Sequence, residues 1–162
     1  ITFIDTGLEA QTGARIKKIE KFIGNDEDFF LTYGDGLSNV DINKLYEFHR
    51  AKNRILTLTG VNPTSPFGTI DFKNGIATSF KEKPRLDGVI NGGFFVCKRR
   101  LFDYLTNDDG CIFEEQPLRT LAGEGNLAVY LHQDFWYAMD TQKHVNELNK
   151  IWDSGNIPWK VW

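Results

Sequence analysis

Two aspartates that follow apolar stretches are the first candidates for chemistry. Asp35 lies between two glycines directly after the run 29–33, and Asp140 follows the aromatic run 135–138. A carboxylate at such a position suits Mg²⁺, which takes oxygen ligands and usually shares them with water and substrate phosphates. Each residue also has a structural alternative, because Asp35 can bond its own backbone in a turn and Asp140 can cap a helix. The spacing leaves both interpretations open.

A second set of polar side chains could hold a phosphate or a hydroxyl group. Lys83 carries a compact positive charge that suits a phosphate, and Glu82 can accept hydrogen bonds from hydroxyl groups. Asn91 precedes a glycine pair inside an apolar stretch, where it can bond a hydroxyl group or the backbone of a bulge. Arg15 follows a Thr-Gly pair at the start of a predicted helix, where backbone N–H groups also attract anions. For Lys83 and Glu82, a solvated charge cluster is the competing interpretation.

The elements that position these residues alternate between strands and helices. This order predicts an α/β fold with a mixed, mostly parallel sheet flanked by helices. The pair Asn74-Gly75 adds an antiparallel hairpin between 67–72 and 76–81, because both residues tolerate positive φ. Ligands of such sheets bind beyond the carboxyl ends of the strands, where Asp35 and Asp140 are expected. Strands are predicted at 2–5, 29–33, 55–61, 89–97, 126–132 and 135–138, and helices at 14–22, 42–52, 98–105, 113–122 and 141–152.

Length and charge restrict the class of protein. The chain has 162 residues, of which 41% are hydrophobic, which suits one ordinary globular domain. A formal net charge of -3 without a basic stripe argues against nucleic acid or an anionic membrane as partner. The apolar runs are far shorter than the roughly 20 residues that a membrane helix needs. Because the chain begins at Ile1 and its single methionine is Met139, we expect it to be part of a longer protein.

An ordered series of short motifs resembles the sugar-phosphate nucleotidylyltransferases. A single tripeptide of this series is weak evidence, but the set occurs in the family's order along nearly the whole chain. The run 33–36, the block 91–96 and the Trp-rich end favour the branch that uses CTP. The matching motifs are Asp5–Gly7, Thr12–Arg15, Leu31–Gly36, Phe67–Gly68, Glu82–Pro84, Asn91–Val96, Glu114–Leu118 and Phe135–Thr141.

The resemblance implies the nucleotide-diphospho-sugar transferase fold and a Mg²⁺-dependent reaction. An oxygen of glucose 1-phosphate attacks the α-phosphorus of CTP, which gives CDP-glucose and pyrophosphate. By the same resemblance, Asp35 and Asp140 hold the metal, Lys83 neutralises the sugar phosphate and Arg15 contacts phosphate. The remaining implied contacts are Glu82 and Asn91 to the glucose hydroxyls, Tyr33 on the nucleotide side, and Gly68 and Gly92, which lend backbone groups or room. The family also implies a homo-oligomer in a bacterial cytoplasm, in the synthesis of surface polysaccharides.

The sequence departs from the family pattern in several places. The family's glycine-rich nucleotide loop and its lysine do not occur, so about 95 residues of a family-sized domain are expected to be missing. We therefore expect residues 1–162 to form a single unit, the C-terminal part of a larger nucleotidylyltransferase domain, and to be inactive alone. Pro66 stands where a basic residue is expected, Gln116 where a carboxylate is expected, and Ala14 where a glycine is usual.

Three other functions remain as alternatives. The first is a nucleotidylyltransferase that uses UTP, dTTP or GTP, because base selection lies mainly outside these residues. The second is a metal-dependent glycosyltransferase of similar sheet topology, which would need an Asp-x-Asp motif after a strand that Asp35-Gly36-Leu37 does not supply. The third is a non-catalytic binding or interaction domain derived from the same fold.

Overall fold

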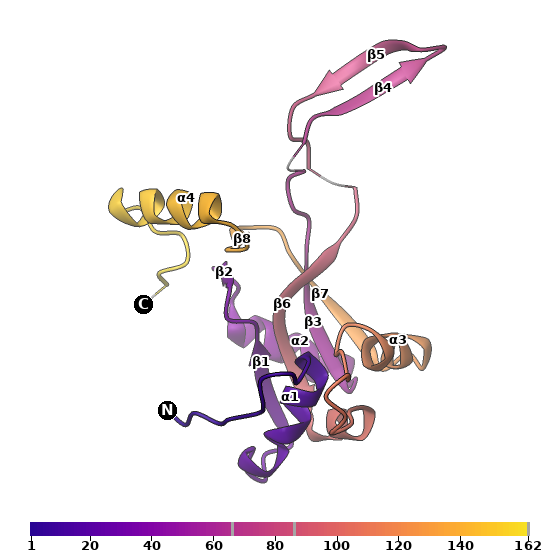
Figure 1. Cartoon of the computed structure of the whole chain (residues 1–162), viewed down its shortest axis with the longest axis vertical. Helices are drawn as coiled ribbons and strands as arrows, with labels where there is room; N and C mark the ends of the chain where they lie inside the picture. The colour runs from indigo at the N-terminus through magenta and orange to yellow at the C-terminus, as the bar shows by residue number, and fades with distance from the viewer. Residues whose placement is uncertain (66, 86, 162) are drawn as a thin grey trace. The chain divides into compact units, whose positions relative to one another are not determined.

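The computed structural model describes residues 1–65, 67–85 and 87–161, and the chain divides into two compact units (Figure 1). The place of the chain within a larger domain stays a prediction, and Pro66 and Trp162 lie outside the described residues. No helix in the described ranges is long and apolar enough to cross a membrane. Unit 1 comprises Ile1–Tyr33, Asp41–Leu58 and Gly93–Tyr130, and unit 2 comprises Gly34–Val40, Thr59–Gly92 and Leu131–Trp162.

The largest sheet among the described residues has four strands in the order β1-β6-β3-β7. Its strands are β1 (Asp28–Thr32), β6 (Ile90–Lys98), β3 (Leu56–Val61) and β7 (Leu127–His132). β1 and β6 pair in antiparallel register, with Leu31 opposite Phe95. Each of the four strands begins and ends within one residue of its prediction, and the expected mixed α/β fold is confirmed.

The helix α2 (Ile42–Lys52) shows how local sequence sets helix ends in unit 1. The Asp41 carboxylate accepts a hydrogen bond from the Lys44 backbone N–H at 3.0 Å and so satisfies a donor of the first turn. Asn53 ends the helix with a left-handed φ of 50°, as a short polar residue can. Both ends agree with the prediction.

Other predicted elements of unit 1 need correction. The predicted helix 14–22 is α1 (Thr12–Lys18) followed by the 3₁₀ turn η1 (Glu20–Phe22), and the next short helix is the 3₁₀ helix η2 (Arg99–Tyr104). α3 (Gln116–Gly123) begins three residues later than predicted, because Pro117 has no N–H and fits only in the first turn. The predicted strand 2–5 is wrong, since no described residue pairs with it and a strand needs a ladder partner.

Aromatic rings fill the core of unit 1. Phe29 and Phe102 stack with ring centroids 5.3 Å apart, and Phe95 meets Phe113 edge to face at 5.5 Å. Such aromatic pairs add stability beyond the area that they bury. The other buried members of this cluster are Ile16, Ile55, Leu56, Leu58, Cys97, Leu101, Leu105 and Leu121.

Unit 2 contains two antiparallel strand pairs and one helix. β4 (Thr69–Lys73) and β5 (Ile76–Lys81) form the predicted hairpin, with Asn74 at φ 50° and Gly75 at φ 80° in its turn. β2 (Gly36–Ser38) pairs with β8 (Trp136–Ala138), and β2 was not predicted. The helix α4 (Gln142–Asp153) follows β8. In the C-terminal tail, the centroid of the Trp159 ring lies 5.4 Å from that of the Phe135 ring.

Candidate active site

The pairing of β2 with β8 brings together the two aspartates that head the sequence-based prediction (Figure 1). In this antiparallel ladder Gly36 lies opposite Ala138, so the start of β2 is next to the end of β8. The Met139 backbone N–H donates to the Asp35 carbonyl oxygen at 2.9 Å, which extends the ladder by one step. Asp35 and Asp140, far apart in the sequence, therefore lie at the same end of one ladder in unit 2.

The carboxylates of Asp35 and Asp140 are exposed and available to a ligand. The cap of α4 is Thr141, whose hydroxyl accepts from the His144 N–H at 3.2 Å, so the alternative role of Asp140 as the cap is wrong. Within the described ranges neither aspartate carboxylate takes part in a hydrogen bond or an ion pair. No group of three or more His, Cys, Asp or Glu residues that could hold a metal occurs there either. Two carboxylates suit Mg²⁺, which completes its six ligands with water and phosphate oxygens.

Lys83 lies in an unusual backbone conformation. It follows β5, its side chain is exposed, and its φ of 46° falls in the left-handed region that costs a non-glycine residue free energy. The Tyr137 hydroxyl donates to the Glu147 carboxylate, and this hydrogen bond is the main cause that lowers the pKa of Glu147. The charge of Lys83 contributes to the same lowering, as does that of Lys143. The Lys83 ammonium therefore acts electrostatically on α4, the helix that follows Asp140.

Two glycines among the predicted site residues, Gly68 and Gly92, leave room for neighbouring atoms. A Cβ atom at Gly68 would lie 2.6 Å from the Phe80 ring and 3.1 Å from the Glu82 carboxylate. A Cβ atom at Gly92 would lie 2.9 Å from the Thr59 carbonyl oxygen. Real Cβ atoms do not approach backbone so closely, so Gly92 allows β6 and β3 to come together.

Trp136 is a residue of this region that the sequence analysis did not identify as part of a site. Its indole N–H donates to the Gly92 carbonyl oxygen at 2.7 Å and so fixes the backbone next to Asn91. Asn91 is half-buried, whereas Glu82 is exposed. The only sequence signal for this contact was the position of Trp136 in a strand that ends near Asp140.

Arg15 and Tyr33 belong to unit 1, whereas the other seven predicted site residues belong to unit 2. The exposed Arg15 guanidinium donates to the Thr6 hydroxyl at 2.8 Å and to the Leu8 carbonyl oxygen at 3.1 Å, so it holds the loop before α1. The Tyr33 hydroxyl donates to Glu114, whose other oxygen accepts from Thr12 at 2.6 Å. Both side chains thus have structural partners in unit 1, and Glu114 is a partner that local sequence could not reveal.

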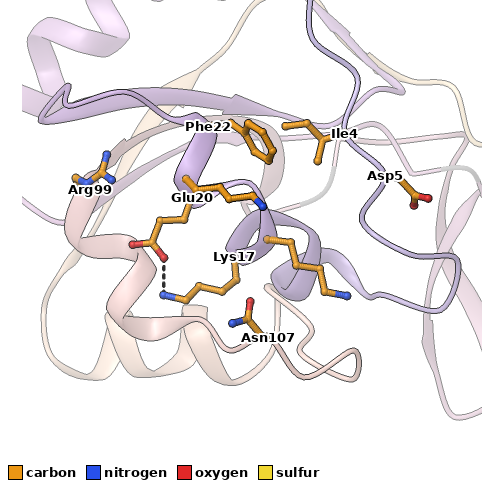
Figure 2. A pocket seen from close by; sticks show the side chains of 9 residues that line it. Ile4, Asp5, Lys17, Glu20, Phe22, Arg99 and Asn107 are labelled. Carbon is orange, nitrogen blue, oxygen red and sulfur yellow. Dashed lines mark ion pairs between the residues drawn. The ribbon is translucent and has the colours of Figure 1, made fainter.

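A cavity in unit 1 of about 690 Å³ is lined by four basic side chains but contains none of the predicted site residues (Figure 2). Each of these four cations has a structural partner, which for Lys21 is the Phe22 ring, whose centroid lies 5.0 Å from the Lys21 Nζ. Lys17 pairs with Glu20 at 2.8 Å, Lys18 pairs with Asp109, and Arg99 donates to backbone carbonyl oxygens. Two of the four positive charges are therefore paired with carboxylates. The cavity is not the candidate site, because none of the predicted site residues lines it.

Comparison with known proteins identifies the family to which the chain belongs. The fold resembles that of a putative glucose-1-phosphate thymidylyltransferase from Bacillus anthracis, with a TM-score of 0.70 over 93% of this chain and 64% of that chain, at 17% identity. The family model described as Nucleotidyl transferase matches residues 2–152. The chain therefore belongs to the nucleotidyl transferase family.

Two bacterial relatives are similar along the whole chain. It is 48% identical over 162 residues to a probable glucose-1-phosphate cytidylyltransferase of Bacillus subtilis, and 41% identical over 163 residues to a glucose-1-phosphate cytidylyltransferase of Salmonella typhimurium. Each alignment covers 100% of this chain and 63% of the relative, so the chain spans less than two thirds of their length. The predicted resemblance to the sugar-phosphate nucleotidylyltransferases is confirmed.

Proposed function

We propose that this chain is part of an enzyme that transfers the cytidylyl group of CTP to α-D-glucose 1-phosphate. The observation that carries the proposal is the β2·β8 ladder, which holds the exposed Asp35 and Asp140 at one end. The names of the Bacillus subtilis and Salmonella typhimurium relatives, at 48% and 41% identity, favour these two substrates.

The reaction is a displacement at phosphorus. An oxygen of the sugar phosphate attacks the α-phosphorus of CTP, a new P–O bond forms, and the bond to the pyrophosphate oxygen breaks. Pyrophosphate leaves with the electron pair of that bond, and CDP-glucose is the other product. Such transfer depends mainly on the position of the reactants and on neutralisation of their charge. Mg²⁺, held by Asp35 and Asp140, would supply a positive charge to the phosphate oxygens.

The remaining predicted residues would orient the substrates. Lys83 would neutralise the sugar phosphate, since its ammonium group is exposed and close enough to act on the charge of Glu147. Glu82 and Asn91 would bond the glucose hydroxyl groups. In unit 1, Arg15 would contact phosphate and Tyr33 the nucleotide, while Gly68 and Gly92 would provide room in unit 2.

We expect the 162 residues alone to be inactive, because the glycine-rich nucleotide loop typical of the family is not among them. The enzyme is further proposed to be a homo-oligomer of the bacterial cytoplasm. Its product would serve the synthesis of surface polysaccharides.

Release of pyrophosphate by the full-length protein tests the proposal. The protein is incubated with glucose 1-phosphate, Mg²⁺ and each of CTP, UTP, dTTP and GTP in separate reactions. Release with CTP alone supports the cytidylyl transfer. Release with another nucleotide supports nucleotidyl transfer but contradicts the proposed specificity for CTP. If none of the four nucleotides gives pyrophosphate, the proposed reaction with glucose 1-phosphate is contradicted.

A further inference from the structure

Asp140 lies in the short link between β8 and α4, and one side-chain hydrogen bond spans this link. The Tyr137 hydroxyl, in β8, donates to the Glu147 carboxylate in the second turn of α4. The two residues are ten positions apart, with Asp140 between them, and all three belong to unit 2. The hydrogen bond therefore closes the chain around one of the two proposed metal ligands.

Tyr137 holds α4 at two points. Besides its bond to Glu147, its ring meets the His144 ring edge to face, with the ring centroids 5.4 Å apart. Tyr137 and Glu147 are both half-buried, where a hydrogen bond is stronger than in open water. Because His144 lies in the first turn of α4 and Glu147 in the second, the two contacts fix the direction of the helix relative to β8.

The bond between Tyr137 and Glu147 is charge-assisted at neutral pH. Burial raises the pKa of Tyr137 to about 12, and the bond to Glu147 contributes to this rise. The same bond is the main cause that lowers the pKa of Glu147. The hydroxyl therefore keeps its proton and the carboxylate keeps its charge. Such bonds are roughly twice as strong as bonds between neutral groups.

The link itself is held through its backbone. The Met139 N–H donates to the Asp35 carbonyl oxygen at 2.9 Å, and the Thr141 hydroxyl caps α4. Within the described ranges the Asp140 carboxylate has no hydrogen bond or ion pair of its own, so its place depends on this backbone and on the angle between β8 and α4. A displacement of about 1 Å is enough to weaken a catalytic site substantially.

We propose that Tyr137 and Glu147 are positioning residues that set the place of the Asp140 carboxylate in the metal site. This role rests on the proposed function, in which Asp35 and Asp140 hold Mg²⁺. The two residues act through the angle between β8 and α4 and not by contact with the substrates. Loss of their hydrogen bond should therefore weaken the use of Mg²⁺ more than the use of glucose 1-phosphate.

The test measures pyrophosphate release by the full-length protein with CTP, at a series of Mg²⁺ concentrations and a series of glucose 1-phosphate concentrations. Tyr137→Phe removes the hydroxyl and keeps the ring that packs on His144. It is expected to raise the Mg²⁺ concentration for half-maximal rate about fivefold, with the KM for glucose 1-phosphate within about twofold of the wild type. Glu147→Gln keeps an acceptor for the hydroxyl and is expected to raise the Mg²⁺ requirement less.

Lys143→Gln is the matched control. The Lys143 ammonium lies 3.8 Å from the other carboxylate oxygen of Glu147, and its side chain is 69% exposed. Exposed ion pairs contribute little, so this variant is expected to keep the Mg²⁺ requirement within about twofold of the wild type. A rise in the Lys143 variant equal to that in the Tyr137 variant overturns the proposed role of the hydrogen bond.

Amide hydrogen exchange of residues 139–145, without substrates, measures the effect on the link independently of catalysis. Tyr137→Phe is expected to speed exchange there, because the link opens more easily without the bond, and Lys143→Gln is not. Exchange or a Mg²⁺ requirement that stays at the wild-type value in Tyr137→Phe overturns this inference, and so does an equal rise in the KM for glucose 1-phosphate.

The wild-type protein separates this inference from the proposed function. If the wild type releases pyrophosphate and Tyr137→Phe behaves like it, only the positioning role is overturned. If the wild type releases none with any nucleotide, the proposed function is contradicted, and the positioning role is overturned with it.

Discussion

Units 1 and 2 differ in whether phenylalanines gather in a buried core, although unit 1 also has exposed ones such as Phe3. Phe95 and Phe102 of unit 1 are each 1% exposed and belong to a continuous aromatic and aliphatic core. Phe67 and Phe72 of unit 2 are 75% and 73% exposed. All twelve buried members of the core cluster belong to unit 1.

The residues that stabilise the fold and most of the residues proposed for catalysis therefore lie in different units. Unit 1 buries apolar area, which is the main favourable term in folding. Unit 2 instead exposes Asp35, Asp140, Lys83 and Glu82, together with large apolar side chains of β4 and β5. Substitutions at these exposed positions of unit 2 should therefore change activity at little cost in stability, whereas substitutions in the core of unit 1 should do the reverse.

The largest expected effect is on turnover in unit 2. Asp140→Asn in the full-length protein should lower Mg²⁺-dependent pyrophosphate release by about 100-fold or more, because it removes one charge from the proposed metal site and keeps its shape. Thermal unfolding should change little, since Asp140 is exposed and does not cap α4. The measurement is the initial rate as a function of Mg²⁺ concentration.

Asp153→Asn is the matched control for this variant. Asp153 is an exposed aspartate at the end of α4, in the same unit. Its loss should leave the rate within about twofold of the wild type. Equal rates for the Asp140 and Asp153 variants would remove Asp140 from the proposed site.

The second effect is on stability in unit 1 and compares two neighbouring positions of β1. Phe29 is 9% exposed and stacks on Phe102, whereas Phe30 is 52% exposed. Phe29→Ala should lower the free energy of unfolding by about 3–5 kcal/mol through lost burial and a cavity. Phe30→Ala should cost less than about 1 kcal/mol. Urea unfolding measures both, and similar losses at the two positions would contradict the assignment of the core to one face of β1.

Local sequence predicted the elements whose causes are local. Asp41 as a cap fixed the start of α2, and Asn74-Gly75 fixed the hairpin turn, because each depends on residues within a few positions. The start of α3 was predicted three residues too early. Pro117 fits only in the first turn of a helix, so it places the start of α3 at Gln116.

The candidate site depends on contacts that local sequence cannot specify. β2 has three residues, and its partner β8 is about a hundred residues away, so no periodicity predicted their pairing. That pairing alone explains why Asp35 and Asp140 share one end of a ladder. Likewise, nothing near Tyr33 indicates that its hydroxyl bonds Glu114, 81 residues later. The aspartates could be selected by type and by their place after strands, and the family resemblance implied a shared metal. No local pattern, however, predicted the ladder that brings them together.

The smallest expected effect is a pH dependence of stability in unit 1. His49 is fully buried among Thr57, Asp28 and Lys98, with its Nδ1 2.8 Å from the Thr57 hydroxyl and its Nε2 3.6 Å from Asp28. Burial lowers the pKa of His49 below its ordinary value of 6.5, although the charge of Asp28 acts in the opposite direction. The unfolded chain keeps the ordinary pKa and therefore binds more protons than the folded chain just below pH 6.5.

The contribution of His49 to stability is accordingly complete above pH 6.5 and is lost as the pH falls from there through the lower pKa of the folded state. Urea unfolding at a series of pH values should show this decline in the wild type. His49→Gln cannot take up a proton and should flatten the curve in that window, whereas the control His144→Gln in unit 2 should keep the decline. If the unfolding free energy of the His49 variant falls with pH as in the wild type, another residue causes the acid sensitivity. If the His144 variant loses the decline, the sensitive group lies in unit 2. That result would contradict the view that unit 1 carries the stability.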